Sequence, residues 1–487
     1  MTDISSRCYL RPMKILGKSC EVHSEVPEPL PFKKFMVYIG PAMMTIALGL
    51  GTSELILYPR LTAEFGTGWI GMMVLSLVIQ TVWAQQMARW TVLTGEHGVK
   101  FNARVISKVG ALVSITFFMF IGFAIPAWAS VAATALLELI HWPASTEIGT
   151  VFWAYVSFLL VLAVILVSKV ARSWIERMAT GATLFAWALL IVAAVTTIKM
   201  GTVAEMGRHL FVWDIPDKMN WWVLGSTLSW VGGGPTLLWY TYWMKDAGWG
   251  MACNFGAIPG GLGKTIKIRS EGLFPEFTPL NISRLKLWLG RSNLVLWGAY
   301  FTGSLLTILI VVGLSDTILR PKGLVPSGFD VIRHQALFFK EPFGAAGAVL
   351  FLVMAWLFFF NNQMSISEAV VRQNADATMT FLGKTDIKKV YFAWWAIYLV
   401  ISFVLIALQY FGGKINPFSF VTYSAMLTLV SLVVSVLATL IGQVVLYKEF
   451  PKELRPSPLS IAVLGAGFIF YVYIIVRALS SFFGKGS

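Results

Sequence analysis

The chain has 487 residues, of which 57% are hydrophobic and only 13% charged, and its mean hydropathy is +0.73. Soluble proteins carry about 25% charged residues, so the composition excludes a soluble protein and indicates an all-α polytopic membrane protein. The net charge of +14 would suggest nucleic-acid binding in a soluble domain. Here the basic residues fall in loops, where Lys and Arg set membrane topology, so no nucleic-acid partner is expected.

The first 34 residues are polar, mixed in charge and proline-bearing, and lack the form of a cleaved signal. We therefore predict a loose cytoplasmic tail over 1–34. The three cysteines, Cys8, Cys20 and Cys253, have neither the spacing of a disulfide framework nor that of a metal site.

About 20 apolar residues are needed to span a bilayer, and the chain contains eleven such stretches. The predicted helices lie near residues 35–60, 68–94, 110–137, 148–170, 175–199, 220–244, 293–315, 344–372, 388–411, 417–447 and 458–480.

Loop charges orient these helices. Basic residues gather in alternate loops, near 100–108, 169–177, 264–269, 384–389 and 448–455, whereas the loop at 316–343 is mixed and fits less well. The excess of Lys and Arg marks the cytoplasmic side. We therefore expect an integral protein of the plasma (inner) membrane, with a cytoplasmic N-terminus and the C-terminus outside.

Two of the predicted helices carry helix-breaking residues near their middle. The first contains Gly49 and Gly51, and the sixth contains Gly232-Gly233-Gly234-Pro235. Broken backbone at membrane depth must be buried in protein or line a cavity, and paired breaks in two halves of a chain are typical of secondary transporters. Residues 35–199 and 220–447 would form inverted repeats of five helices each, of the LeuT type, within a transporter core at 35–450. Residues 451–487 would add an extra helix.

At these breaks the sequence resembles the Nramp divalent-metal transporters, over about residues 35–450. Gly40-Pro41 opens the first helix as in that family, and Gly51-Thr52-Ser53-Glu54 stands where the family has Asp-Pro-Gly-Asn. Gly234-Pro235-Thr236 stands at the Met-Pro-His of the family's sixth helix, and Asn361-Asn362-Gln363-Met364-Ser365 resembles its Gly-Gln-Ser-Ser-Thr stretch in the eighth. The resemblance implies a LeuT-type fold.

The departures from the family concern the metal ligands. Family members bind Mn²⁺ or Fe²⁺ through the Asp, the Asn and the Met sulfur, but this chain has Gly51 and Gly234 at the Asp and Met positions, and Thr236 replaces the His. Soft sulfur ligands select transition metals. Their loss favours a hard or partly hydrated cation.

Glu54 is the strongest candidate ligand, because ionisable groups inside a membrane are costly and tend to be functional. Oxygen atoms of Thr52, Ser53 and Thr236 would complete a set suited to Mg²⁺, Ca²⁺, Mn²⁺ or Na⁺. The predicted metal site therefore comprises Glu54, Gly51, Thr52, Ser53, Gly234, Thr236 and, at the family's Gln, Gln363. The alternative is that Glu54 is a structural carboxylate, either paired or protonated.

Other polar residues in the helices have structural interpretations. Glu368 precedes Arg372 by four residues, which predicts an ion pair along one helix face. Gln80, Gln85, Gln86 and Arg89 suit interhelical hydrogen bonds, and Pro126 predicts a kink. The run 256–265 looks like a phosphate-binding loop but has Ile258 at a required Gly, so ATP is not expected.

These observations lead to a secondary transporter of a divalent cation, with a hard oxygen site and H⁺ or Na⁺ as a coupling ion. Two alternatives stay open: an ion-coupled symporter of a small organic solute, and a non-transporting receptor or complex subunit that would use the long loop at 245–290. No convergent catalytic set occurs, so we expect neither an enzyme nor a bound cofactor. The sequence does not define the oligomeric state.

Overall fold

The computed structural model describes residues 10–16, 18–23, 25–29, 31, 40–167, 171–254, 272–382 and 387–484. Only the backbone is described for residues 10–15, 18–21, 23, 51, 52, 166, 167, 171–178, 254, 380–382, 387 and 388. The phosphate-loop look-alike at 256–265 lies outside the described residues.

Within the described ranges, ten helices are long and apolar enough to cross a membrane. They are Gly40–Phe65, Ile70–Thr94, Lys108–Ile140, Thr146–Ile165, Ala179–Thr197, Pro279–Lys322, His334–Met379, Lys389–Phe411, Pro417–Glu449 and Pro458–Phe483. Two shorter helices, α11 (Trp221–Ser229) and α12 (Leu237–Asp246), follow each other across a break and form one further crossing. The eleven predicted crossings are therefore confirmed, and the chain is an integral membrane protein.

The first half of the chain contains the following elements: α1 (Gly40–Gly49), η2 (Leu50–Leu57), α2 (Tyr58–Phe65), α3 (Ile70–Thr94), α4 (Gly98–Ile106), α5 (Lys108–Ala111), η3 (Leu112–Phe117), α6 (Phe118–Ala124), α7 (Ala127–Ile140), α8 (Thr146–Val167), α9 (Ala171–Thr197) and α10 (Met200–His209). The second half adds, around α11 and α12, the elements η4 (Val231–Thr236), η5 (Gly250–Asn254), α13 (Pro279–Asn293), η6 (Leu294–Phe301), α14 (Thr302–Leu314), η7 (Ser315–Leu319), η8 (Arg320–Lys322), η9 (His334–Ala336), α15 (Leu337–Leu382), α16 (Ile387–Leu408), η10 (Gln409–Phe411), α17 (Pro417–Glu449), η11 (Lys452–Leu454) and α18 (Pro458–Phe483).

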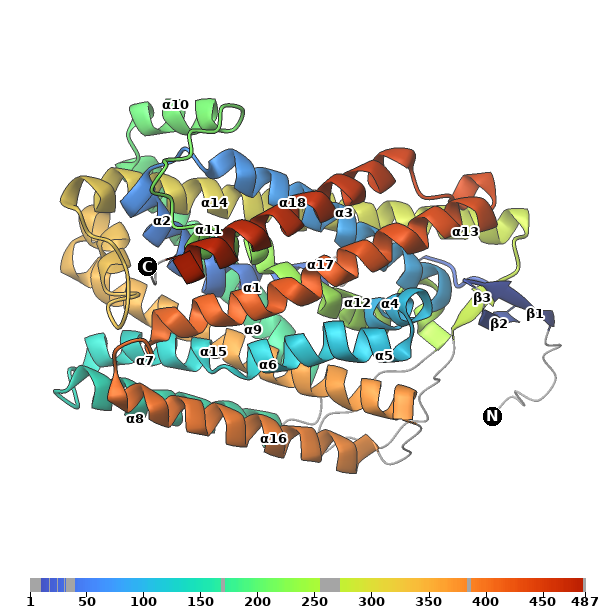
Figure 1. Ribbon diagram of the computed structural model, residues 1–487, viewed down its shortest axis with the longest axis horizontal. Helices are drawn as coiled ribbons and strands as arrows, with labels where there is room; N and C mark the ends of the chain where they lie inside the picture. Colours follow the sequence, from blue (N-terminus) through green and yellow to red (C-terminus); the bar gives the residue numbers. More distant parts are fainter. Residues whose placement is uncertain are drawn as a thin grey trace.

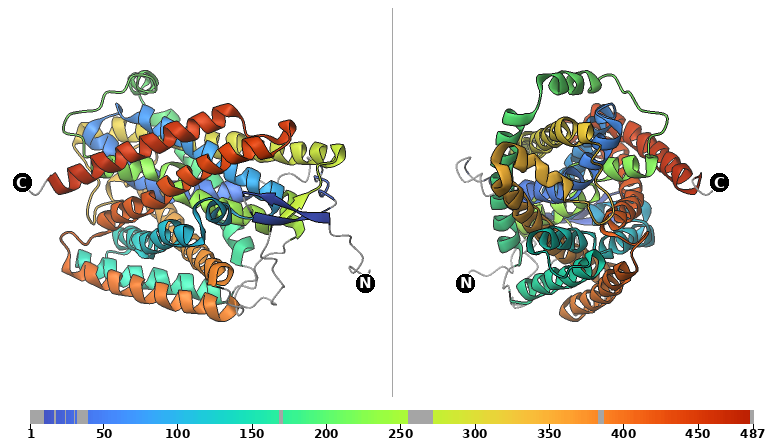
Figure 2. Two further views of the ribbon diagram at one scale, coloured as in Figure 1. Left: turned by 45° about the vertical axis from the view of Figure 1, so that its right-hand side comes forward. Right: turned by 90° about the vertical axis from the view of Figure 1, so that its left-hand side faces the viewer.

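The helices run roughly along the long axis of the molecule, with α1 near the centre of the bundle (Figure 1; Figure 2). Every residue of α1 is buried, whereas α8 and α16 lie together at the periphery and expose apolar side chains such as Leu159 and Val400. Because apolar side chains are as stable in lipid as in a protein core, the exposed ones mark the lipid-facing surface.

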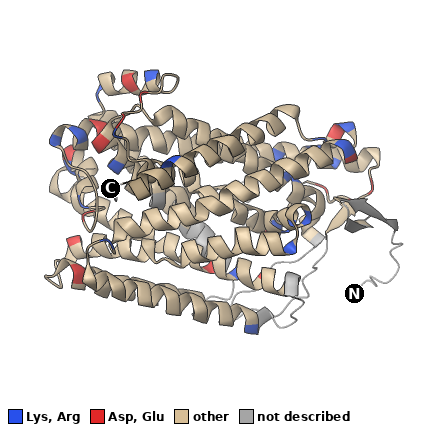
Figure 3. Cartoon of the chain, in the orientation of Figure 1, with Lys and Arg blue, Asp and Glu red and all other residues tan. Residues whose placement is uncertain are grey.

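Charged residues gather toward the two ends of the bundle (Figure 3). The strands β1 (Leu10–Ile15) and β2 (Lys18–His23) lie at one end, and α18 finishes at the other (Figure 1). Because the chain crosses the membrane an odd number of times, its two termini must lie at opposite ends of the bundle, as they do here. We call the end with the strands the basic end, because two of the basic regions predicted from the sequence lie there, 100–108 in α4 and 448–455 at the end of α17.

The predicted loose tail is partly wrong. β1 and β2 form an antiparallel hairpin, and β2 pairs in parallel with β3 (Leu273–Pro275). Val26 is fully buried, and its N–H donates to Asn281 Oδ1 at 3.1 Å. The tail has structure because it pairs with a segment about 250 residues later, which local composition does not reveal.

The third crossing bends at Pro126, as predicted. α6 ends at Ala124 and α7 begins at Ala127. Two hydroxyls satisfy the carbonyls released there: Tyr398 Oη donates to Phe123 at 3.0 Å, and Ser402 Oγ donates to Ala124 at 2.9 Å.

Candidate cation site

Glu54 lies in the middle of the first crossing, within η2, a stretch of π-helix. η2 joins α1 to α2, so the interruption predicted here takes the form of a widened turn in a continuous helix. In a π-helix each N–H pairs with the carbonyl five residues earlier, and such turns are frequent at functional sites. The Glu54 side chain is buried, with 1% of its surface exposed. The π-helix thus places a carboxylate inside the bundle.

The sixth crossing is interrupted between α11 and α12, as predicted. Gly232, Gly233 and Gly234 have φ values of 56°, 99° and 57°, which residues with a Cβ rarely adopt. A Cβ at Gly234 would lie 2.2 Å from the carbonyl oxygen of Ser229. Only glycine fits this close approach of backbone to backbone.

The two interruptions contact each other at Glu54. Ser53 Oγ donates to the carbonyl oxygen of Trp230 at 2.7 Å and lies 3.3 Å from Glu54 Oε2. A Cβ at Gly49 would lie 2.9 and 3.1 Å from the two Glu54 carboxylate oxygens and 3.1 Å from the carbonyl carbon of Gly232. The carboxylate therefore lies where η2 meets η4, beside glycine backbone.

Side chains from α3 satisfy the backbone at the end of α11. Ser76 Oγ and Gln80 Nε2 both donate to the carbonyl oxygen of Leu228, at 2.7 and 3.0 Å. Ser76 Oγ is also 2.8 Å from Tyr471 Oη on α18. The interhelical role predicted for Gln80 is confirmed, and it fixes the first half of the interrupted helix.

Amides from the second half of the chain contact the backbone just before η2 and within it. Asn362 Nδ2 donates to the carbonyl oxygen of Leu48 at 2.9 Å, and Gln335 Nε2 donates to that of Leu55 at 2.9 Å. Buried carbonyls are nearly always paired. These two contacts therefore stabilise the π-helical geometry from outside the helix.

Two buried hydroxyls beside the interruption of the sixth crossing have no hydrogen-bond partner among the described residues. They belong to Tyr300 on η6 and Ser304 on α14, and each side chain is at most 1% exposed. The nearby Tyr58 hydroxyl pairs with Ser53 and the backbone of Gly232. An unsatisfied buried polar group costs about 1–3 kcal/mol. Both unpaired hydroxyls are therefore available to hydrogen-bond with water or a ligand.

The site offers oxygen ligands. In the described part of the chain Glu54 has no ion-pair partner, and no three His, Cys, Asp or Glu side chains come together as a metal-binding group. The segments η2 and η4 provide one carboxylate, together with hydroxyl and carbonyl oxygens. Such ligands suit hard cations.

The predicted ligands divide into groups. Ser53 contacts Glu54, whereas Thr236 Oγ1 donates to the carbonyl oxygen of Gly233 at 2.8 Å and caps the break that contains Gly234. The backbone of Gly51 and Thr52 belongs to η2, and the side chain of Thr52 lies outside the described residues.

Gln363 lies in a different hydrogen-bond network. Its Oε1 accepts from the N–H of Ala129 on α7 at 3.0 Å, and its Nε2 donates to Ser367 Oγ at 3.0 Å and Tyr398 Oη at 2.9 Å. These contacts link α15 to the bend after Pro126 and to α16. The neighbouring Asn362 is the residue that reaches η2.

Sequence reasoning missed the hydroxyls of Tyr58, Tyr300 and Ser304. A signal existed for Tyr58, which follows Glu54 by four residues and so lies on the same helix face. Tyr300 and Ser304 lie in the seventh crossing, where nothing in the hydrophobic pattern distinguishes them.

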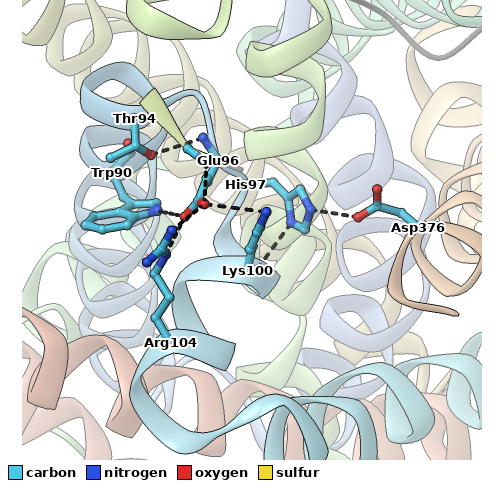
Figure 4. Close-up of polar contacts among 8 residues, drawn as sticks. Trp90, Thr94, Glu96, His97, Lys100, Arg104 and Asp376 are labelled. Carbon is cyan, nitrogen blue, oxygen red and sulfur yellow. Dashed lines mark hydrogen bonds and ion pairs between the residues drawn. The ribbon is translucent and has the colours of Figure 1, made fainter. Parts of the chain in front are cut away.

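At the basic end, a cluster of buried charges ties the α3–α4 junction together (Figure 4). Arg104 donates to Glu96 through Nε at 2.7 Å and Nη2 at 2.8 Å, and the N–H of Gly272 donates to the same carboxylate at 2.8 Å. Burial alone would raise the pKa of Glu96, but Arg104 and the charge of Lys100 hold it below its usual range. Glu96 is therefore a charged anchor for this junction.

His97 connects the same junction to α15. Its Nε2 lies 2.8 Å from Asp376 Oδ2, and its Nδ1 accepts from the N–H of Lys100 at 3.3 Å (Figure 4). These contacts assign the neutral tautomer with the proton on Nε2. The ring stacks on Tyr242 with centroids 4.0 Å apart. Burial lowers the pKa of His97, against the opposing effect of Asp376.

The structural interpretation of Glu368 is confirmed. Arg372 Nε donates to Glu368 at 2.6 Å, one turn away on α15, and Arg372 Nη1 also lies 2.7 Å from Asp246 on α12. The basic end is thus held by an ion pair from α15 to α12 and by the hydrogen bond from Asp376 on α15 to His97 at the α3–α4 junction.

Comparisons with known proteins bear on the fold. No protein-family model matches the chain, and no curated protein sequence does. Among solved structures, the manganese transporter of Eremococcus coleocola, in complex with an aromatic bis-isothiourea compound, is 13% identical, with a TM-score of 0.59 over 95% of this chain and 91% of that one. A mutant of that transporter is 14% identical, with a TM-score of 0.59 over 96% and 92%. The resemblance predicted from the sequence is thus confirmed for the fold, and the chain has the LeuT-type transporter fold.

Proposed function

We propose that this protein is a secondary transporter that moves a divalent cation of the Mg²⁺ or Mn²⁺ class by alternating access, with Glu54 as the anionic ligand. The observation that carries the proposal is the buried Glu54 carboxylate at the contact between η2 and η4, without an ion-pair partner among the described residues. A buried carboxylate is costly unless a cation or a proton compensates its charge. A transported cation would supply that compensation.

The chemistry of the neighbouring groups supports a hard cation. Ser53 lies against the carboxylate, and the other nearby groups are hydroxyl oxygens and glycine backbone. Gly234 occupies the position at which the resembling family has a sulfur ligand. The structurally similar Eremococcus protein is a manganese transporter, which supports an inorganic cation over an organic solute as the cargo.

Alternating access requires one end of the bundle to open while the other closes. The hydrogen bond between His97 and Asp376 and the ion pair between Asp246 and Arg372 join α15 to the α3–α4 junction and to α12 at the basic end. Opening toward this end, which we assign to the cytoplasm, would separate these pairs. H⁺ or Na⁺ would provide the driving gradient.

The test is uptake into proteoliposomes that contain a cation-sensitive dye, comparing Mg²⁺, Mn²⁺, Ca²⁺ and Na⁺ with and without a pH or Na⁺ gradient. Glu54→Gln removes the charge and keeps the size, and Glu64→Gln is the control because Glu64 lies on the next turns of the same crossing and pairs with Arg60. We expect saturable uptake of Mg²⁺ or Mn²⁺ that is lost in Glu54→Gln and retained in Glu64→Gln. Equal uptake by Glu54→Gln and the unaltered protein would refute the role of Glu54, and the absence of flux for any cation would refute the cargo.

A further inference from the structure

A cavity of about 310 Å³ lies at the end of the bundle away from the strands, where α7 ends and α8 begins (Figure 1). The segment 329–333, which precedes η9, lines it from the other side. Its polar lining comprises Thr134, Glu138, His141, Thr150, Asp330 and Arg333, and its apolar lining includes Leu137 and Phe329. Cavities of this size with apolar walls and a few polar groups typically bind small molecules.

This cavity is separate from the candidate cation site. None of its lining residues belongs to η2 or η4, and Glu54 lies in the middle of a crossing rather than at the end of the bundle. Within the described part of the chain, no three His, Cys, Asp or Glu side chains come together as a metal-binding group. The cavity therefore suits an organic ligand better than a metal ion.

Two carboxylates in the cavity share one guanidinium. Arg333 Nε lies 3.3 Å from Glu138 Oε1, and Arg333 Nη1 lies 3.7 Å from Asp330 Oδ1. Asp330 and Arg333 are exposed and Glu138 is partly buried, so these charges lie toward the open side of the cavity. Two negative charges and one positive charge leave one negative charge in excess. A ligand with a single positive charge would balance it.

Thr150 supplies a polar group at the buried side of the same cavity. Its side chain is fully buried, and its Oγ1 has no hydrogen-bond partner among the residues that the structure describes. The hydroxyl of Thr134, by contrast, donates to the carbonyl oxygen of Val131 at 2.8 Å. A buried hydroxyl without a partner is costly, and it can donate one hydrogen bond and accept two. A hydroxyl group of a ligand would satisfy it.

We propose that this cavity binds a small organic ammonium compound. The ammonium group lies between Glu138 and Asp330. A hydroxyl group of the ligand binds Thr150, and its apolar body packs against Leu137 and Phe329. The ligand enters from the end of the bundle that we assign to the outside. This inference does not depend on the proposed function, because the cavity and the cation site share no residue.

The experiment measures binding of 2-amino-1-phenylethanol to the purified full-length protein by titration calorimetry at pH 8, where histidine in water carries no charge. Two comparison ligands are 2-phenylethylamine, which lacks the hydroxyl, and 1-phenylethanol, which lacks the ammonium group. The variants are Glu138→Gln, Arg333→Met and Thr150→Val, which keeps the branched shape. The control is Glu341→Gln, because Glu341 is an exposed carboxylate that pairs with Lys322 and does not line the cavity. Thermal melting of each variant verifies that it is folded.

Loss of one hydrogen bond, or of one partly exposed charge, corresponds to about a fivefold change in affinity. We expect Glu138→Gln to weaken binding of both amines by this factor. Arg333→Met should strengthen binding of both amines, because the two carboxylates then face the ammonium group without a competing guanidinium. Thr150→Val should weaken binding of 2-amino-1-phenylethanol and leave that of 2-phenylethylamine unchanged. Glu341→Gln should change neither.

Several results would overturn the inference. They are the absence of binding, equal binding of 1-phenylethanol, unchanged binding in Glu138→Gln, and weaker binding in Arg333→Met. Equal weakening of both amines in Thr150→Val would show that its hydroxyl does not recognise the ligand's hydroxyl. Glu54→Gln should bind 2-amino-1-phenylethanol normally, whatever its effect on cation uptake. If Glu54→Gln loses amine binding while the cavity variants keep it, the amine occupies the cation site and the inference fails.

Discussion

The hydroxyl of Tyr471 lies 2.8 Å from Ser76 Oγ, across 395 residues of sequence. Tyr471 belongs to α18, the crossing beyond the two repeats, and its side chain is fully buried. Ser76 in turn donates to the carbonyl oxygen of Leu228, where α11 ends. The additional helix therefore takes part in fixing the interruption beside Glu54.

We predict that Tyr471→Phe slows cation uptake severalfold at an unchanged amount of folded protein. The change removes one hydroxyl and leaves Ser76 free to reorient, so the half-helix before the break is held less rigidly. The expected loss of stability is about 1 kcal/mol. Proteoliposome uptake and thermal melting are the measurements. Tyr473→Phe is the control, because Tyr473 lies two residues further on α18 and is exposed. Equal uptake by the two variants would contradict a positioning role for Tyr471.

We predict that Gly234→Ala abolishes uptake. Gly234 has φ 57° and ψ −127°, and an added Cβ would lie 2.2 Å from backbone oxygen, so the break must change shape. The control is Gly201→Ala, since a Cβ at that position of α10 meets open space. The measurements are expression level, melting temperature and uptake. A folded Gly234→Ala protein with normal uptake would show that the geometry of η4 is not needed.

Hydropathy and helix breakers predicted much of this fold. Eleven apolar stretches predict eleven crossings, because lipid requires each crossing to satisfy its own backbone. The break at 232–235 was predictable because three glycines and a proline disfavour a helix whatever surrounds them. The π-helix at Glu54 was not, because its geometry depends on Asn362 and Gln335, more than 270 residues away.

The candidate site was only partly predictable for the same reason. Neighbouring residues on a helix point about 100° apart, so a shift of one residue decides whether Gln363 or Asn362 reaches η2. The sequence indicates which residues are polar, but the helix rotation is set by packing. Tyr300 and Ser304 join the site through the packing of the seventh crossing, which no local pattern encodes.

We predict that Arg104→Met destabilises the protein strongly. Arg104 makes two hydrogen bonds to Glu96, and both side chains are buried. Removing one partner of a buried pair costs about 3–5 kcal/mol, because the other charge is left uncompensated. Here Lys100 remains 3.5 Å from Glu96 and compensates part of its charge. We therefore expect a loss of stability of about 3 kcal/mol, at the lower end of that range. The readout is the melting temperature in detergent. The exposed pair Lys322–Glu341 gives the control, and Glu341→Gln should change the melting temperature little. Similar shifts in the two variants would contradict the anchoring role of Glu96.

The last prediction concerns acidification at His97. Its pKa in the folded protein is lowered by burial, below the value of about 6.5 for an exposed histidine. As the pH falls through 6.5, the unfolded chain takes up a proton before the folded protein does, so this part of the stability is present above that pH and is lost below it. The loss is at most about 1.4 kcal/mol per pH unit and ends at the folded pKa. Three charged groups near the ring also affect the pKa of His97: Asp376 raises it, and Lys245 and Lys100 lower it.

His97→Asn tests this prediction, because asparagine can still accept from the N–H of Lys100 at the start of α4 but does not titrate. We expect the melting temperature of the unaltered protein to fall more than that of His97→Asn between pH 7.5 and pH 5.5. Glu96 does not make the stability depend on pH in this range, since its pKa lies below its usual value. Parallel melting curves for the two proteins over this range would show that His97 takes up its proton at the same pH in the folded and the unfolded chain, and would remove it as the origin of acid sensitivity.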